Sequence, residues 1–280
     1  MRRLIINADD LGMSAEVNAQ IEKGITLGVL TSSSLMANAP EFNDGVRIAK
    51  QYPRVSVGVH LNIIEYAPLT NQEIFKKHRI VGNDGCFIEG AVFCTTIDDE
   101  LSRAIFEEWD AQITKVENAG IVPTHVDSHQ HTHTIAALQD VLCRIMDKHN
   151  IKIVRRKIIP SIRLMLHAKK QPKVVELDKS KATMSPKRSI IYRRLHVFAV
   201  KYSSIRWNRA MASKYSMTNA FFSFRDFYMN RELLNLGGKN STIELMCHPG
   251  NRPFNQESEM LMKDMSWLDK SYMLISYHKL

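Results

Sequence analysis

The segment THVDSHQHTH, residues 124–133, concentrates side chains that could do chemistry. It holds four of the chain's eleven histidines within nine residues, with one aspartate between the first two. Neutral imidazole is the commonest side-chain ligand for metal ions, and it also transfers protons near neutral pH. The cluster therefore indicates a metal site, a proton-transfer site or a polar surface strand.

The spacing within this cluster limits how many histidines can share one ion. In an extended strand one face would carry the alternate residues His125, Asp127, His129, His131 and His133. Neighbours at i and i+2 then lie about 6.5–7 Å apart, so one or two of them would bind the ion. We expect the others to hydrogen-bond substrate or to orient the ligands. A surface strand explains the cluster less well, because its adjacent imidazoles would gain nothing from one another.

Polar residues also end three other apolar runs. Asp9 and Asp10 close NADD, His60 lies in GVHLN, and His248 lies in ELMCHPG. Two adjacent carboxylates are costly to keep ionised without a nearby cation, yet aspartate also caps helices at such junctions. For His60 and His248, a hydrogen-bonded core histidine is the alternative to a functional role, which for His248 would be proton donation.

Taken together, these residues supply the components of metal-assisted hydrolysis. One carboxylate and two imidazoles make a three-ligand site that keeps positions open for water and substrate. A second carboxylate can act as base on the water, and a histidine across the site can protonate the leaving group. The chemistry fits an amide or an ester. Such donors suit zinc, manganese or cobalt, and magnesium less obviously.

The elements that must position these residues alternate between strands and helices. We expect strands at residues 4–9, 32–39, 55–63, 124–131, 151–158 and 241–249, and helices at 14–28, 42–52, 98–120 and 135–150. Alternation of this kind predicts an α/β fold with parallel strands, either a doubly wound sheet or a (β/α) barrel. No GxGxxG follows the first strand, so dinucleotide binding loses its main support. In a barrel, chemistry occurs at the C-terminal ends of strands, where these polar residues fall.

Composition is that of an ordinary globular chain of 280 residues, 44% hydrophobic and 24% charged. The sequence contains no run of 18 or more uncharged apolar residues, so we expect no membrane span. The N-terminal apolar run stops at Asp9, too early for a signal peptide. The four cysteines show no CxxC spacing, so we expect neither a zinc knuckle nor a disulfide framework. We expect a cytoplasmic location.

The stretches NADDLGMS, GVHLN, THVDSHQHTH and ELMCHPG, in this order, resemble the YdjC-like (ChbG-type) carbohydrate deacetylases. The resemblance covers about residues 1–150 and resumes at residue 241. It implies a distorted, TIM-barrel-like (β/α) barrel and an enzyme that removes N-acetyl groups from N-acetylglucosamine units of short oligosaccharides.

The resemblance also implies roles for individual residues. Asp10, His60 and His129 correspond to metal ligands, Asp9 to the general base and His248 to the general acid. Supporting roles fall to His125, Asp127 and His131, while Arg155 is expected to orient Asp9 electrostatically. The expected cofactor is one divalent metal ion, Mg²⁺ or Zn²⁺, with Mn²⁺ and Co²⁺ as alternatives.

The chain departs from the family in its middle. Its net charge is +9, and residues 151–210 contain 17 Lys and Arg against 2 acidic residues, which leaves 21 basic and 27 acidic residues elsewhere. We expect one domain over residues 1–280 with a basic, mainly helical insertion at about 159–228. It would contact an acidic, phosphorylated or lipid-linked sugar at the barrel mouth. The alternatives for this insertion are a solvent-exposed helical segment, a homodimer contact, or an amphipathic helix that lies on an anionic membrane.

Two other functions compete with deacetylation. The same metal barrel would suit a phosphoester hydrolase or a sugar isomerase, although two-metal phosphatases usually need more carboxylate ligands. The basic segment would suit a nucleic-acid-binding protein. The sequence contains no helix-turn-helix, zinc-finger or RNP signature, so we expect no nucleic-acid partner.

Overall fold

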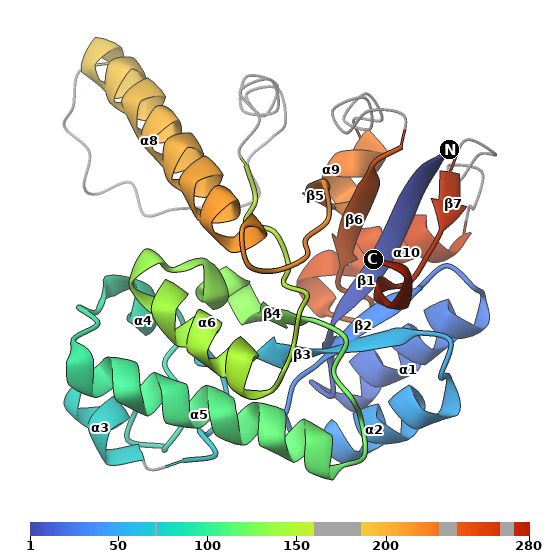
Figure 1. The fold of residues 1–280 in the computed structure, drawn as a ribbon, viewed down its shortest axis with the longest axis horizontal. Helices are drawn as coiled ribbons and strands as arrows, with labels where there is room; N and C mark the ends of the chain where they lie inside the picture. Colours follow the sequence, from blue (N-terminus) through green and yellow to red (C-terminus); the bar gives the residue numbers. More distant parts are fainter. Residues whose placement is uncertain (71, 160–185, 230–239, 264–271) are drawn as a thin grey trace. The chain divides into compact units, whose positions relative to one another are not determined.

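The computed structural model describes residues 1–70, 72–159, 186–229, 240–263 and 272–280 (Figure 1). The chain forms two compact units. The first comprises Met1–Arg156 with Tyr215–Leu280, and the second comprises Lys157–Lys214. The first unit contains all the candidate site residues.

In the part of the chain that the structure describes, the first unit is built on a seven-stranded sheet whose strand pairs are all parallel. Its strands are β1 (Arg2–Leu11), β2 (Ser32–Leu35), β3 (Ser56–Leu61), β4 (Val126–Ser128), β5 (Ala220–Ser223), β6 (Thr242–Cys247) and β7 (Tyr272–Leu274). The order is β4-β3-β2-β1-β6-β5, and β7 pairs with the start of β1. The predicted α/β class with parallel strands is therefore confirmed.

Closure of the sheet into a full barrel is not seen among the described residues. Beyond β4 the sheet continues only as single bridges, from Val126 to Val154 and from Ile153 to Ser216. The strand expected at 151–158 is thus reduced to these bridged residues. A second difference concerns β5, which lies within the range 159–228 expected as an insertion. This strand pairs with β6 and so belongs to the sheet.

Helices α1 (Ala15–Thr26), α2 (Phe42–Gln51), α5 (Asp99–Asn118) and α6 (Gln139–Lys148) follow the strands much as expected (Figure 1). The hydroxyl of Ser14 accepts a hydrogen bond from the Val17 N–H and so caps α1. Gly28 follows this helix with φ +75°, a left-handed conformation that suits glycine. The other α-helices of the described residues are α3 (Gln72–Lys77), α4 (Ala91–Cys94), α8 (Pro186–Ala212), α9 (Phe224–Met229) and α10 (Asn255–Lys263).

Within the range expected as an insertion, the described residues include one long helix, α8, and the strand β5. Helix α8 belongs to the unit Lys157–Lys214, whereas residues 160–185 lie outside the described residues. In the described ranges, no helix combines the length and apolarity needed to cross a membrane.

One face of the sheet is polar although it is buried. The register pairs Ile5 with Glu244 and His60 with Asp127, and places Ser34 beside Gly58. Residues that pair in register share a face, so these polar side chains point the same way. Helices α1, α2 and α5 pack against the strands with apolar residues, among them Ile21, Ile48 and Trp109. The polar face therefore forms the interior in which a site can be built.

Candidate active site

Strand β1 delivers two adjacent carboxylates through a break in its register. Its pairing with β2 shifts between Ala8 and Leu11, and Asp10 has φ +68°. A regular strand would send Asp9 and Asp10 to opposite faces. The left-handed residue breaks that alternation, and both side chains line the same cavity.

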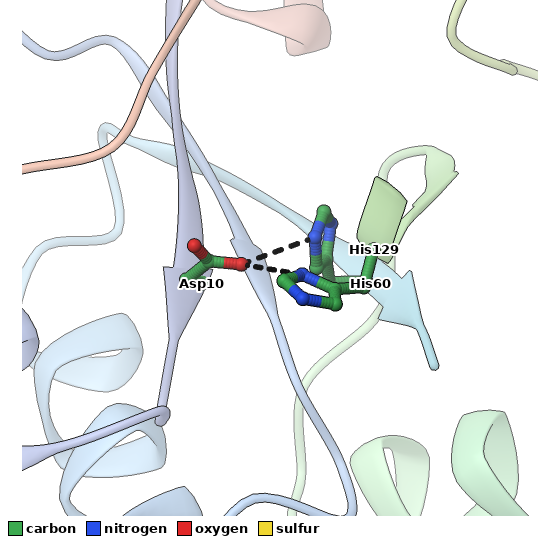
Figure 2. A group of neighbouring side chains, drawn as sticks. All are labelled: Asp10, His60 and His129. Carbon is green, nitrogen blue, oxygen red and sulfur yellow. Dashed lines mark hydrogen bonds and ion pairs between the residues drawn. The ribbon is translucent and has the colours of Figure 1, made fainter. Parts of the chain in front are cut away.

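One carboxylate oxygen of Asp10 contacts the rings of both His60 and His129 (Figure 2). Its Oδ1 lies 3.0 Å from His129 Nδ1 and 3.4 Å from His60 Nε2. One donor atom from each of the three residues lies within 4.8 Å of the others. A carboxylate oxygen and two imidazole nitrogens at this spacing fit a divalent ion, with small shifts to reach bonds of about 2.0–2.2 Å. The three expected ligands thus meet at one point.

The histidine cluster is not the continuous strand that its alternation predicted. Strand β4 ends at Ser128, and residues His129–Thr134 form a 3-10 turn in which Gln130 and His131 have φ +50° and +58°. The histidines therefore point in different directions. Backbone strain of this kind overrides the local alternation and often occurs at functional sites.

The opposite nitrogen of His60 is held by a buried carboxylate. His60 Nδ1 donates to Asp127 Oδ1 at 2.7 Å, and the Ser34 hydroxyl donates to Asp127 Oδ2 at 2.6 Å. A carboxylate can only accept hydrogen bonds, so this contact assigns the proton to Nδ1 and directs Nε2 towards Asp10. Carboxylates orient metal-binding imidazoles in this way.

Arg155 is the buried cation of the site. Its Nη1 and Nη2 donate to the two oxygens of Asp9 at 2.7 and 2.6 Å. Nη2 also lies 2.8 Å from Asp127 Oδ2, and Nε donates to Glu244 Oε1 at 2.7 Å. The predicted link between Arg155 and Asp9 exists as a two-pronged ion pair, the geometry that a planar guanidinium favours.

The charges of the site favour a cation between its ligands. Burial disfavours the charged form of Asp10, but the hydrogen bonds from His129 and His60 outweigh it and hold the pKa of Asp10 well below its ordinary value. Burial likewise works against protonated His60, yet Asp127 and Asp10 raise the pKa of His60 to about 10. The pKa of His129 is raised to about 9, against burial, chiefly by its hydrogen bond with Asp10. Protons and a metal ion would therefore compete for these rings.

His248 follows β6 and lies on the wall of the same cavity. Its ring stacks on Phe254 with centroids 4.1 Å apart, and Glu257 Oε1 lies 3.9 Å from its Nδ1. Burial would lower the pKa of His248, but Glu257, Asp9 and Asp10 together raise it. The shift favours the protonated ring, the form that a general acid requires.

The remaining histidines of the cluster have different positions. His125 is fully buried, stacks on Tyr277 at 3.9 Å, and has a pKa lowered to about 3 by burial. It packs so close to Gly58 that a Cβ there would meet its ring at 2.5 Å. His133 is also buried and contacts Ser128 and the Arg155 carbonyl. Only His131 faces the cavity, with its ring edge against Phe221 and a pKa lowered to about 4 by burial.

A cavity of about 500 Å³ joins the groups that could act on a substrate. Its wall includes Asp9, Asp10, His60, His129, His131 and His248, whereas His125, Asp127 and Arg155 lie buried behind it. The structure thus separates the nine candidate residues into those that a substrate could touch and those that hold them in place.

Sequence reasoning missed several residues of this site, among them Ser34, Glu244 and Glu65. Ser34 binds Asp127, Glu244 binds Arg155, and Glu65 lies near His129 on the cavity wall. A signal for Glu244 was present, because it is a single carboxylate in the apolar run of β6. Burial raises its pKa to about 7, although Arg155 opposes that shift. Ser34 and Glu65 had no comparable signal.

Comparison with known sequences decides the family. The sequence model described as YdjC-like protein matches residues 3–276. The chain belongs to the YdjC-like family. Among curated relatives of this YdjC-like chain are proteins named carbohydrate deacetylase from Clostridium beijerinckii, 34% identical over 157 residues, and from Halalkalibacterium halodurans, 33% identical over 152 residues.

These alignments cover only part of either protein. They include 56% and 54% of the YdjC-like chain and 61% and 62% of the relatives, so the chain spans about three fifths of the length of the curated relatives that it matches. A solved structure from Enterococcus faecalis V583, named for cellobiose-phosphate cleavage, superposes with a TM-score of 0.66 at 18% identity. The superposition covers 99% of this chain and 98% of that one, and supports the fold alone.

Proposed function

We propose that this protein is a metal-dependent carbohydrate deacetylase that removes N-acetyl groups from an N-acetylated sugar or oligosaccharide. The observation that carries the proposal is the meeting of Asp10, His60 and His129 beside Asp9 and His248 in one cavity. The names of the curated relatives support the same activity and an acetylated sugar as substrate.

The three donor residues would hold one divalent ion, and their mixture of one oxygen and two nitrogens suits zinc, cobalt or manganese. Once bound, the ion would polarise the acetyl carbonyl and promote loss of a proton from water. Asn251 Nδ2 donates to Asp10 Oδ2 at 3.2 Å, which keeps Oδ1 turned towards the two histidines. Asp127 keeps His60 in the tautomer whose Nε2 is free to bind.

Asp9 would take the proton from the attacking water. Asn7 Nδ2 and Arg155 Nη2 donate to its Oδ1, and Arg155 Nη1 donates to its Oδ2. An ionised carboxylate has about four acceptor positions, so one on Oδ2 is left for a proton. Arg155 would hold this group towards the cavity without taking part in the proton transfer.

His248 would give its proton to the departing amine nitrogen. Its ring lies on the cavity wall, and stacking on Phe254 limits its rotation. The neighbouring carboxylates favour its protonated form. Base and acid therefore come from the ends of different strands, β1 and β6, as in other enzymes with parallel sheets.

The direct test is acetate release by purified, metal-loaded protein from a panel of N-acetylated sugars. The panel would include free oligosaccharides as well as phosphorylated, nucleotide-linked and lipid-linked forms. Release of acetate that depends on both the metal and His129 supports the proposal. Hydrolysis of phosphoesters by the same preparation, without acetate release from any sugar, would refute it and favour the competing metal-dependent reaction.

A further inference from the structure

The two imidazoles proposed as ligands have similar environments. Each ring faces Asp10 Oδ1 with one nitrogen, His60 with Nε2 and His129 with Nδ1. Each ring also faces a second carboxylate with its other nitrogen. For His60 this carboxylate is Asp127, and for His129 it is Glu65, whose Oε1 lies 3.8 Å from Nε2.

We propose that Glu65 is a positioning residue for His129, holding its Nε2–H while Nδ1 binds the metal ion. This inference rests on the proposed metal site and adds to it a residue that no comparison assigns. An imidazole that binds an ion through one nitrogen carries its proton on the other, and that N–H needs an acceptor. A bound ion would withdraw charge from the ring and so make the N–H a stronger donor.

The backbone around Glu65 is held in place by buried amides. Asn62 Oδ1 accepts the Glu65 N–H at 3.2 Å, and the Glu65 carbonyl accepts from Asn62 at 2.7 Å and from Asn38 at 3.2 Å. Gln112 in turn binds both the backbone N–H and the carbonyl of Asn62. Asn62 directly follows β3, the strand that carries His60, so this strand end carries one ring and supports the carboxylate beside the other.

The remaining gap is small. The 3.8 Å between His129 Nε2 and Glu65 Oε1 exceeds the usual N···O distance of a hydrogen bond by less than about 1 Å, since that distance is about 2.9–3.0 Å. The Glu65 side chain is 33% exposed and lines the cavity, so rotation about its own bonds can close the gap. Because the side chain is partly in water, its effect should be smaller than that of fully buried Asp127.

Glu89 offers a matched control. It is another carboxylate on the same cavity wall, and its Oε1 accepts a hydrogen bond from the Gln130 side chain. Replacing Glu89 removes the same charge from the same cavity without removing the partner of His129. A general electrostatic effect would therefore appear in both variants, whereas positioning would appear only at Glu65.

The experiment measures Zn²⁺ affinity of the full chain by competition with a chromophoric chelator. Glu65→Ala should weaken binding about tenfold, the lower end for an outer partner of a ligand. Glu65→Gln should weaken it less, because its amide oxygen still accepts a hydrogen bond, and Glu89→Ala should leave it within about twofold. In ¹⁵N-histidine-labelled, zinc-loaded protein, the Nε2–H signal of His129 should be protected in the wild type and lost to exchange in Glu65→Ala.

Different results overturn different claims. Unchanged Zn²⁺ affinity and an unchanged Nε2–H signal in Glu65→Ala would refute the role of Glu65 while leaving the metal site intact. Equal losses of Zn²⁺ affinity in Glu65→Ala and Glu89→Ala would show that Glu65 acts only through its charge and does not position His129. If Glu65→Gln loses as much affinity as Glu65→Ala and alters the visible spectrum of the Co²⁺ form, Glu65 is itself a ligand. A wild type that binds no Zn²⁺ would overturn the inference together with the metal site.

Discussion

The guanidinium of Arg155 donates hydrogen bonds to both carboxylate oxygens of Asp9, at 2.7 and 2.6 Å, on the buried polar face of the sheet. The same side chain binds Asp127 and Glu244, so one cation contacts three acidic side chains. Asp9 and Asp127 stand next to the proposed metal ligands. The position of the proposed base and the orientation of His60 therefore depend on a single side chain.

Replacing Arg155 should be strongly destabilising. Arg155→Met leaves the buried carboxylates of Asp9 and Asp127 without their cation and Glu244 without its hydrogen-bond donor. Loss of one partner from a buried pair typically costs about 3–5 kcal/mol of unfolding free energy. Urea unfolding followed by circular dichroism measures the loss. Arg47, which pairs with Glu22 and Asp44 on the surface, provides the control, and Arg47→Met should have a much smaller effect. Comparable losses in the two variants would contradict the central role of Arg155.

Asp9→Asn should separate metal binding from turnover. The amide keeps the shape of the side chain but cannot act as a base, so we expect turnover to fall by roughly 10²–10⁴-fold. Metal content, measured by atomic emission, should stay near that of the wild type because Asp10, His60 and His129 are intact. Loss of the metal from this variant would instead make Asp9 a ligand and reverse the roles of the two aspartates.

His248→Gln should impair departure of the amine. We expect normal Zn²⁺ affinity and a fall in kcat that becomes larger as the leaving amine becomes a poorer leaving group, because the missing proton matters most there. A series of acetylated substrates with leaving groups of graded basicity measures this dependence. An equal fall across the series would point to a structural histidine held by Glu257 and Phe254.

Metal removal should lower thermal stability as well as activity. A ligand that binds only the folded state stabilises it by about 2.7 kcal/mol at one hundred times its dissociation constant. Treating the protein with a chelator should lower Tm, and adding Zn²⁺ should restore it. In Asp10→Ala the ion should no longer change Tm, since the oxygen shared by His60 and His129 is absent. A Zn²⁺-dependent Tm shift of wild-type size in Asp10→Ala would place the ion elsewhere.

Glu244 should make stability depend on pH. Its pKa is raised from the ordinary 4.5 to about 7 by burial, so the folded state keeps a proton that the unfolded chain has released in that window. Stability from this group is therefore greatest below about pH 4.5 and declines as pH rises towards 7, by at most about 1.4 kcal/mol per unit. Glu244→Gln removes this dependence.

Urea unfolding of the wild type and Glu244→Gln between pH 5 and 8 tests whether the contribution of Glu244 to stability declines as pH rises. The stability of the variant relative to the wild type should improve as pH rises. Arg155 stays protonated throughout this range, because its pKa is raised well above its ordinary value, so it adds no pH dependence of its own. A relative stability that stays level, or that worsens with rising pH, would show that Glu244 is ionised in the folded protein across the window.

Local sequence patterns determined much of this protein. Apolar periodicity and capping residues such as Ser14 and Gly28 placed the first helices and strands, because these signals act over one or two turns of chain. The polar residues at the expected strand ends indicated a metal site, and the family resemblance implied Asp10, His60 and His129 as its ligands; these three do meet at one point. Their convergence was predictable because the carboxyl ends of parallel strands share one edge of a sheet.

Tertiary structure decided what local alternation could not. Alternation predicted one face for the histidines of residues 125–133, but β4 stops at Ser128 and a left-handed turn sends the later ones elsewhere. Which buried groups touch was likewise open. Glu244 binds Arg155, and Glu65 lies near His129, through pairings of segments 89 and 64 residues apart. Such contacts depend on strand order and register, which are set by packing of the whole sheet and leave no trace in any short stretch of sequence.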